Sequence, residues 1–238
     1  SVSRPIEEHE ETGMVESIAE VLPYAVGVAI SPVPVIAVIL MLFSARAKAN
    51  GPMFLAGWVV AAGAVSAITY VLADAGDAAT DTTTADTISW GQIVIGVFLL
   101  LVAARQWRRR PAPGTDAEMP KWMAGIDSFS PFKSFALALV LAGVNPKNLL
   151  LSAGAGAALA QLGPATSDAV VSLIVYVLLA SITIAGPVIY YLLGGDAAKR
   201  ALDELKAWLA AHNAAVMATL FVVFGVKLIA EGLPVLGS

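Results

Sequence analysis

The chain contains no cysteine, only two histidines and few charged residues. Charged residues make up 13% of its 238 positions, whereas a soluble domain has about a quarter. The missing cysteines exclude disulfides, thiolate catalysis and cysteine-ligated metal sites. Hydrophobic residues reach 58% and the mean hydropathy is +0.79. This composition predicts a polytopic membrane protein.

Carboxylates are absent from the centres of the long apolar segments. Proton-coupled carriers usually place an acidic residue or a histidine there. The sequence also lacks a carboxylate pair, a histidine-metal spacing, a nucleophile elbow and a phosphate loop. We therefore predict no enzyme activity, no metal site, no cofactor and no nucleic-acid partner.

Six apolar segments are long enough to cross a bilayer, which takes about 20 residues. They run over residues 15–43, 53–73, 88–106, 135–162, 167–193 and 213–233. The first and the fourth exceed a straight span by about eight residues, which fits two half-helices joined by a non-helical crossing. The predicted fold class is an all-α polytopic membrane protein with six transmembrane helices.

Both overlong segments contain helix-breaking residues near their centres. The first carries Ser31-Pro32-Val33-Pro34, and the fourth carries Asn145-Pro146-Lys147-Asn148. Proline removes a backbone donor, and in lipid the freed polar groups need other partners. A pair of interrupted segments at matching places is the best sequence indication of a transporter binding site. We expect three prolines to hold the half-helices open: Pro32, Pro34 and Pro146.

Aligning Pro32 with Pro146 brings the following spans into rough register. Each half has three spans, and an odd number turns the second half over in the membrane. We predict two inverted three-helix repeats. The predicted domains are an acidic tail, a first repeat, a cytoplasmic linker and a second repeat, at residues 1–14, 15–110, 111–134 and 135–238. The alternative is an ordinary pair of proline kinks.

Basic residues occur in every second connection between the spans. The connections after the first, third and fifth spans contain arginine and lysine, whereas those after the second and fourth contain aspartate and no base. Positive charge marks cytoplasmic loops. The pattern therefore places both termini outside.

Lys147 indicates a binding site most directly, because it lies near mid-bilayer depth, where a lysine is costly. Asn145 and Asn148 offer amide groups beside it, and the free N–H groups of the next half-helix start there. With no carboxylate at this depth, these features predict an anion site between Asn145–Asn148 and Ser31–Pro34, in which Ser31 takes part. The alternative is a structural role, in which Lys147 binds backbone carbonyls of the broken helices.

Lys227 lies inside the sixth span and is a secondary candidate for the site. The ordinary explanation is favoured here: its side chain extends to the outer surface or pairs with Glu231, one turn further on.

The two proline motifs and their surroundings resemble a known family. Residues 25–58, with the first motif and Asn50-Gly51, look like the opening signature of the GAP family in the LysE transporter superfamily. Residues 125–129 and 143–150, with the second motif, resemble its second signature. The resemblance covers nearly the whole chain, from about residue 22 to residue 233.

The resemblance implies six spans and an export role in a bacterial plasma membrane. This branch includes the glycopeptidolipid- and sulfolipid-addressing proteins, which are linked to delivery of envelope lipids to the cell surface. It implies membrane lipids as partners and an anionic or polar cargo, such as an envelope lipid, moved outward by alternating access. A homo-oligomer is compatible with it. Two alternatives stay open: an exporter of a small water-soluble solute, such as an amino acid or inorganic anion, and a scaffold for envelope-lipid assembly.

Overall fold

The computed structural model describes residues 4–77, 83–108 and 121–233. Within these ranges every element is helical, as the composition predicts, and there is no strand. The elements are α1 (Arg4–Ala29), α2 (Pro32–Leu42), α3 (Ala47–Asp77), α4 (Thr83–Arg108), a 3-10 helix η1 (Lys121–Ser128), α5 (Pro131–Gly143), α6 (Pro146–Leu162) and α7 (Thr166–Gly232).

Several described helices have the length and composition of membrane spans. Ala47–Ala75 of α3 and Thr166–Ala230 of α7 qualify by themselves. Two bent pairs qualify if each pair forms one span: Gly13–Ala29 with Pro32–Leu42, and Pro131–Gly143 with Pro146–Leu162. These helices support the prediction that the chain is a membrane protein. The count of six spans and the inverted repeat stay predictions.

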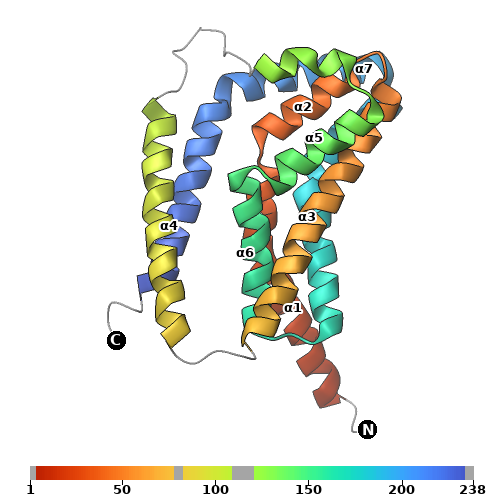
Figure 1. The fold of residues 1–238 in the computed structure, drawn as a ribbon. Coiled ribbons are helices and arrows are strands. Elements are labelled where there is room, and N and C mark those ends of the chain that lie inside the picture. The colour runs from red at the N-terminus through yellow and green to blue at the C-terminus, as the bar shows by residue number, and fades with distance from the viewer. Residues whose placement is uncertain (1–3, 78–82, 109–120, 234–238) are drawn as a thin grey trace. The chain divides into compact units, whose positions relative to one another are not determined.

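Both breaks predicted from the proline motifs are present. α1 and α2 meet at 57°, and α5 and α6 meet at 66° (Figure 1). Ser31 has φ −126° and ψ 90° before Pro32, and Asn145 has φ −58° and ψ 120° before Pro146. A proline disfavours the helical conformation in the residue that precedes it. Each incoming helix therefore ends just before its proline motif, and a new helix begins at the proline.

One predicted boundary needs correction. α5 begins at Pro131 and not at residue 135, because Ser130 caps the helix and its side chain accepts the backbone N–H of Lys133 at 3.3 Å. The helical run of α7 (Thr166–Gly232) covers both spans predicted at residues 167–193 and 213–233, except for residue 233. The run is interrupted at Gly195, whose φ of 57° and ψ of −138° suit glycine.

The helices form two compact units. The first contains Ser1–Ala78 and Pro120–Lys206, and the second contains Ala79–Met119 and Ala207–Ser238. Each unit takes residues from both predicted repeats. The two units are defined by packing, whereas the predicted domains are defined by sequence order. The units therefore do not test the predicted domain boundaries, which stay predictions.

In the first unit, α3 packs against α5 and α6, and α1 packs against α6 (Figure 1). The backbone of α3 approaches its neighbours where glycines lie. A Cβ atom at Gly57 would meet the carbonyl oxygen of Phe135, and one at Gly156 would meet the carbonyl oxygen of Ser66. Small residues of this kind allow membrane helices to pack closely, which brings α6 and its polar first turn against the rest of the unit.

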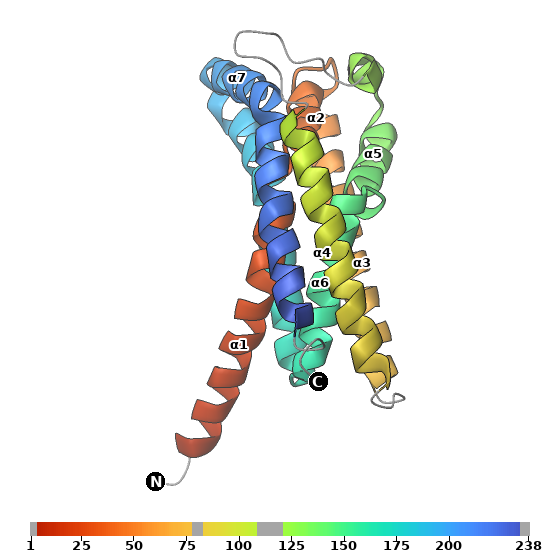
Figure 2. The same ribbon diagram turned by 90° about the vertical axis from the view of Figure 1, so that its left-hand side faces the viewer.

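The second unit pairs α4 with the last part of α7, and the two helices run side by side in both views (Figures 1 and 2). Gly96 of α4 and Gly225 of α7 face each other at the contact. A Cβ atom at Gly96 would lie 2.7 Å from the carbonyl oxygen of Gly225, and one at Gly225 would lie 2.9 Å from that of Gly96. The absence of side chains at both positions sets the distance between these helices.

We expect Gly156→Ala to destabilise the protein by about 1–3 kcal/mol, because the added methyl group has no space against α3. Thermal unfolding in detergent measures the effect. Gly186→Ala is the matched control, since a Cβ atom at this helical glycine meets no other atom within 4 Å. Equal unfolding temperatures for the two variants would show that the close α3–α6 contact at Gly156 does not determine the stability of the protein.

Candidate functional site

Three of the four predicted binding residues meet in the first compact unit, at the point where both broken helices change direction. Ser31, Lys147 and Asn148 are buried there, with exposed fractions of 4%, 9% and 1%. We call these three residues the break cluster. Two of them lie in the first turn of α6, and Ser31 lies between α1 and α2.

The first break leaves the carbonyl oxygen of Ile30 without a helical donor. In a regular helix this oxygen would accept the N–H of residue 34, but Pro34 has none. The Lys147 Nζ atom donates to this oxygen at 2.7 Å and to the Ser31 Oγ atom at 2.6 Å. The lysine thus replaces a backbone donor that the proline removed.

The second break is satisfied in a similar way. The backbone N–H of Asn145 donates at 2.9 Å to Val140 O, which lies one residue further back in the chain than the regular helical acceptor, Leu141 O. The Asn148 Nδ2 atom donates to Leu141 O at 2.8 Å. Neighbouring side chains of α6 therefore supply one donor to each break.

Ser31 connects the two breaks directly. Its hydroxyl accepts the hydrogen bond from Lys147 and donates to the Asn148 Oδ1 atom at 2.9 Å. The fourth predicted residue, Asn145, lies beside the cluster and caps α6, because its Oδ1 atom accepts the backbone N–H of Lys147 at 3.1 Å. Asn145 positions Lys147 through the helix start and not through a side-chain contact with it.

The prolines shape the same region. Pro146 occupies the first position of α6, where a missing N–H costs nothing because a helix start has no internal acceptor for it. Pro32 and Pro34 are buried in the first turn of α2. Of the first three residues of α2, only Val33 keeps an N–H. The start of α2 therefore offers few free backbone donors to a ligand.

The electrostatics of the cluster favour negative charge. α2 and α6 both begin here, and the start of a helix carries a partial positive charge. The described hydrogen bonds of Lys147 go to neutral oxygen atoms. Neither of the ion pairs within the described ranges involves this lysine. The bond to Ile30 O is the backbone contact predicted for a structural role, and the anion site stays a prediction.

Two further hydroxyl groups of α7 join it to the broken helices, and the sequence does not indicate either contact. The Thr183 hydroxyl of α7 donates to Ala29 O at 2.6 Å, and the Tyr176 hydroxyl donates to Ser152 Oγ at 2.7 Å. Both contacts join residues that are distant in sequence or on different helices. A hydroxyl inside an apolar helix gives no indication of which distant carbonyl it will bind.

Asn50 forms a second connection between the two broken pairs. It is fully buried, and its Nδ2 atom donates to Ser44 Oγ at 3.1 Å and to Phe129 O at 3.0 Å. It therefore ties the segment after α2 to the segment before α5. The family signature contains Asn50, but the sequence alone offers no role for it.

Lys227, the secondary candidate, lies on α7 in the second compact unit and is partly buried. It is not part of the break cluster as defined by Ser31, Lys147 and Asn148. Its role stays a prediction.

The model of the family described as Sap, sulfolipid-1-addressing protein, matches residues 21–234. No curated protein and no solved structure shows a significant match. The matched region contains both proline motifs and the whole break cluster. It agrees with the resemblance to sulfolipid-addressing proteins, while membership of the wider LysE superfamily stays a prediction.

We expect Ser31→Ala and Asn148→Ala to be non-additive. The double variant should be more stable, by about 1 kcal/mol, than the sum of the single effects, because both substitutions remove the same hydrogen bond. Reversible unfolding in detergent micelles measures this coupling. The control is Ser31→Ala with Ser66→Ala, since Ser66 bonds to its own helix. Additivity in both cycles would contradict the contact.

Proposed function

This chain belongs to the sulfolipid-1-addressing protein family, and from this we propose that it is an exporter or flippase for an anionic or polar, lipid-like cargo. The cargo moves outward across a bacterial plasma membrane by alternating access. The central site is the break cluster, between two inverted three-helix repeats with both termini outside. The membrane lipids are its partners, and a homo-oligomer is compatible with this arrangement.

The observation that carries the proposal is the buried ammonium group of Lys147 at the meeting point of two helix starts. A lysine at membrane depth is costly, and its described partners, Ile30 O and Ser31 Oγ, are neutral. A phosphate, sulfate or carboxylate group would compensate this charge. The helix starts of α2 and α6 add to the attraction.

In the proposed mechanism, the cargo exchanges with contacts that exist within the protein. An anionic headgroup competes with Ile30 O and Ser31 Oγ for the Lys147 ammonium. The competition weakens the link between the α1–α2 break and α6. Asn148 holds the α5–α6 break through Leu141 O while this link changes. Cargo binding and movement of the two broken helices are therefore coupled through one side chain.

A lipid cargo requires a lateral opening between helices, whereas an amino acid or inorganic anion needs only an aqueous path. This difference separates the proposal from a small-solute exporter. A scaffold for envelope-lipid assembly requires neither path and should tolerate loss of the Lys147 charge.

We expect Lys147→Met to lose a bound anionic lipid that the unaltered protein retains, because methionine keeps the length of the side chain and removes its charge. Native mass spectrometry of both proteins, extracted with their own lipids, measures this. The control is Lys133→Met, which removes an exposed lysine from α5. Lys147→Arg, which keeps the charge, should retain the lipid in part.

Loss of one donor to Ile30 O should also lower stability by about 1–3 kcal/mol, so thermal unfolding accompanies the lipid measurement. If Lys147→Met stays folded and retains the same lipid as the unaltered protein, the central lipid site is wrong. If neither protein retains a selected lipid, uptake of amino acids and inorganic anions into liposomes becomes the decisive comparison, and activity there would favour the small-solute exporter.

A further inference from the structure

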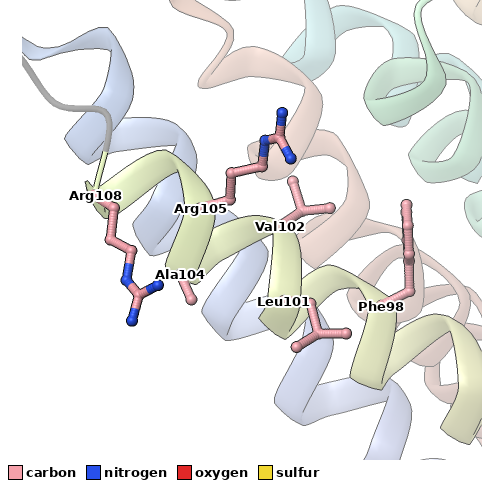
Figure 3. Close-up of a pocket in the computed structure, with 6 residues that line it drawn as sticks. All are labelled: Phe98, Leu101, Val102, Ala104, Arg105 and Arg108. Atoms are coloured by element: carbon pink, nitrogen blue, oxygen red, sulfur yellow. The ribbon is translucent and has the colours of Figure 1, made fainter.

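A second candidate binding surface lies on α4, in the second compact unit. A groove of about 830 Å³ is lined by one face of this helix: Phe98, Leu101, Val102, Ala104, Arg105 and Arg108 (Figure 3). The spacing of these residues places them on adjoining turns of the helix. They form two rows, each apolar at one end and basic at the other: Phe98–Val102–Arg105 and Leu101–Ala104–Arg108.

Both ends of this groove are accessible. The exposed fractions of Phe98 and Leu101 are 60% and 66%, and both arginines are exposed. The two ion pairs found among the described residues involve neither arginine. The groove therefore combines exposed apolar surface with two guanidinium groups that have no carboxylate partner within the described ranges.

The distances along α4 match one leaflet of a bilayer. A helix rises about 1.5 Å per residue, so Phe98 lies roughly 10 Å deeper than Arg105 when the helix crosses the membrane. Half of the hydrocarbon core is about 15 Å thick. The predicted topology puts the arginine end of α4 on the cytoplasmic side. With Arg105 and Arg108 at headgroup level, Phe98 and Leu101 lie at the level of the acyl chains.

We propose that this face of α4 binds one anionic membrane lipid of the cytoplasmic leaflet. Its phosphate or sulfate group binds the guanidinium groups of Arg105 and Arg108, whose side chains extend from α4 in diverging directions in the structure (Figure 3) and turn together around the bound group. Guanidinium groups suit such oxygens because they offer several N–H donors in a fixed plane. One acyl chain lies over Phe98, Leu101 and Val102. The site goes beyond the proposed transport, and it rests on the predicted third span and on the predicted topology that places the arginine end of α4 on the cytoplasmic side.

Arg105→Gln/Arg108→Gln tests the headgroup contact. The full-length protein in detergent is titrated with phosphatidylglycerol or phosphatidylcholine, and native mass spectrometry counts the bound lipid. We expect an apparent affinity for phosphatidylglycerol about thirty-fold weaker in the double variant, the scale for two basic groups at a membrane surface. Binding of phosphatidylcholine should change little. Inorganic phosphate at millimolar concentration should not displace the lipid, because it has no chain to occupy the apolar rows.

Arg46→Gln/Lys48→Gln is the matched control, since it removes two exposed basic residues from another predicted cytoplasmic connection that the groove does not include. This control should keep the phosphatidylglycerol affinity. Phe98→Ala should weaken the binding of both lipids, because it removes the apolar end of one row. Lys147→Met should keep the α4 site, so loss of lipid in that variant alone concerns the break cluster and not α4.

Equal losses in the α4 double variant and its control would show general charge attraction and would overturn the site. Unchanged phosphatidylglycerol affinity in a folded double variant would overturn it as well. Displacement by inorganic phosphate would show a free-anion site in place of a lipid site. Far-ultraviolet circular dichroism before each titration confirms that the variants are helical.

Discussion

The fold of the first unit depends on how two broken helices satisfy the backbone groups that the breaks leave without helical partners. Within a bilayer, an unpaired carbonyl costs several kcal/mol, and water is absent from most of the span. Ile30 O and Leu141 O obtain their donors from Lys147 and Asn148, which are consecutive residues. One turn of α6 thus stabilises both breaks. The same atoms form the proposed cargo site, so stability and binding compete for the same donors.

Proline alone does not explain where the helices break. Pro23 and Pro187 lie inside helices that continue through them. The residues before the breaking prolines are Ser31 and Asn145, whose side chains compete with helical backbone bonding and favour helix starts. Leu22 and Gly186, which precede the tolerated prolines, have no such side chain. Each break therefore coincides with a residue that favours helix starts before the proline, although only Asn145 caps its helix with its side chain.

The sequence predicts the helical class, both breaks and the contact between Ser31 and the second motif, because these follow from hydropathy, proline chemistry and the depth of Lys147. It does not predict the bonds of Thr183 and Asn50, since each joins residues far apart in the chain. Whether a lysine binds cargo or a carbonyl cannot be read from its depth, because both roles compensate the same buried charge.

The adjacency of Lys147 and Asn148 makes the site sensitive to helical phase. Each residue added or removed in α6 rotates the following side chains by about 100° around the helix axis. Deletion of Pro146, or insertion of one residue before Lys147, would turn both donors away from Ile30 O and Leu141 O at once. Sequence drift in the apolar parts of α6 is therefore tolerated far better than any change in the length of its first turn.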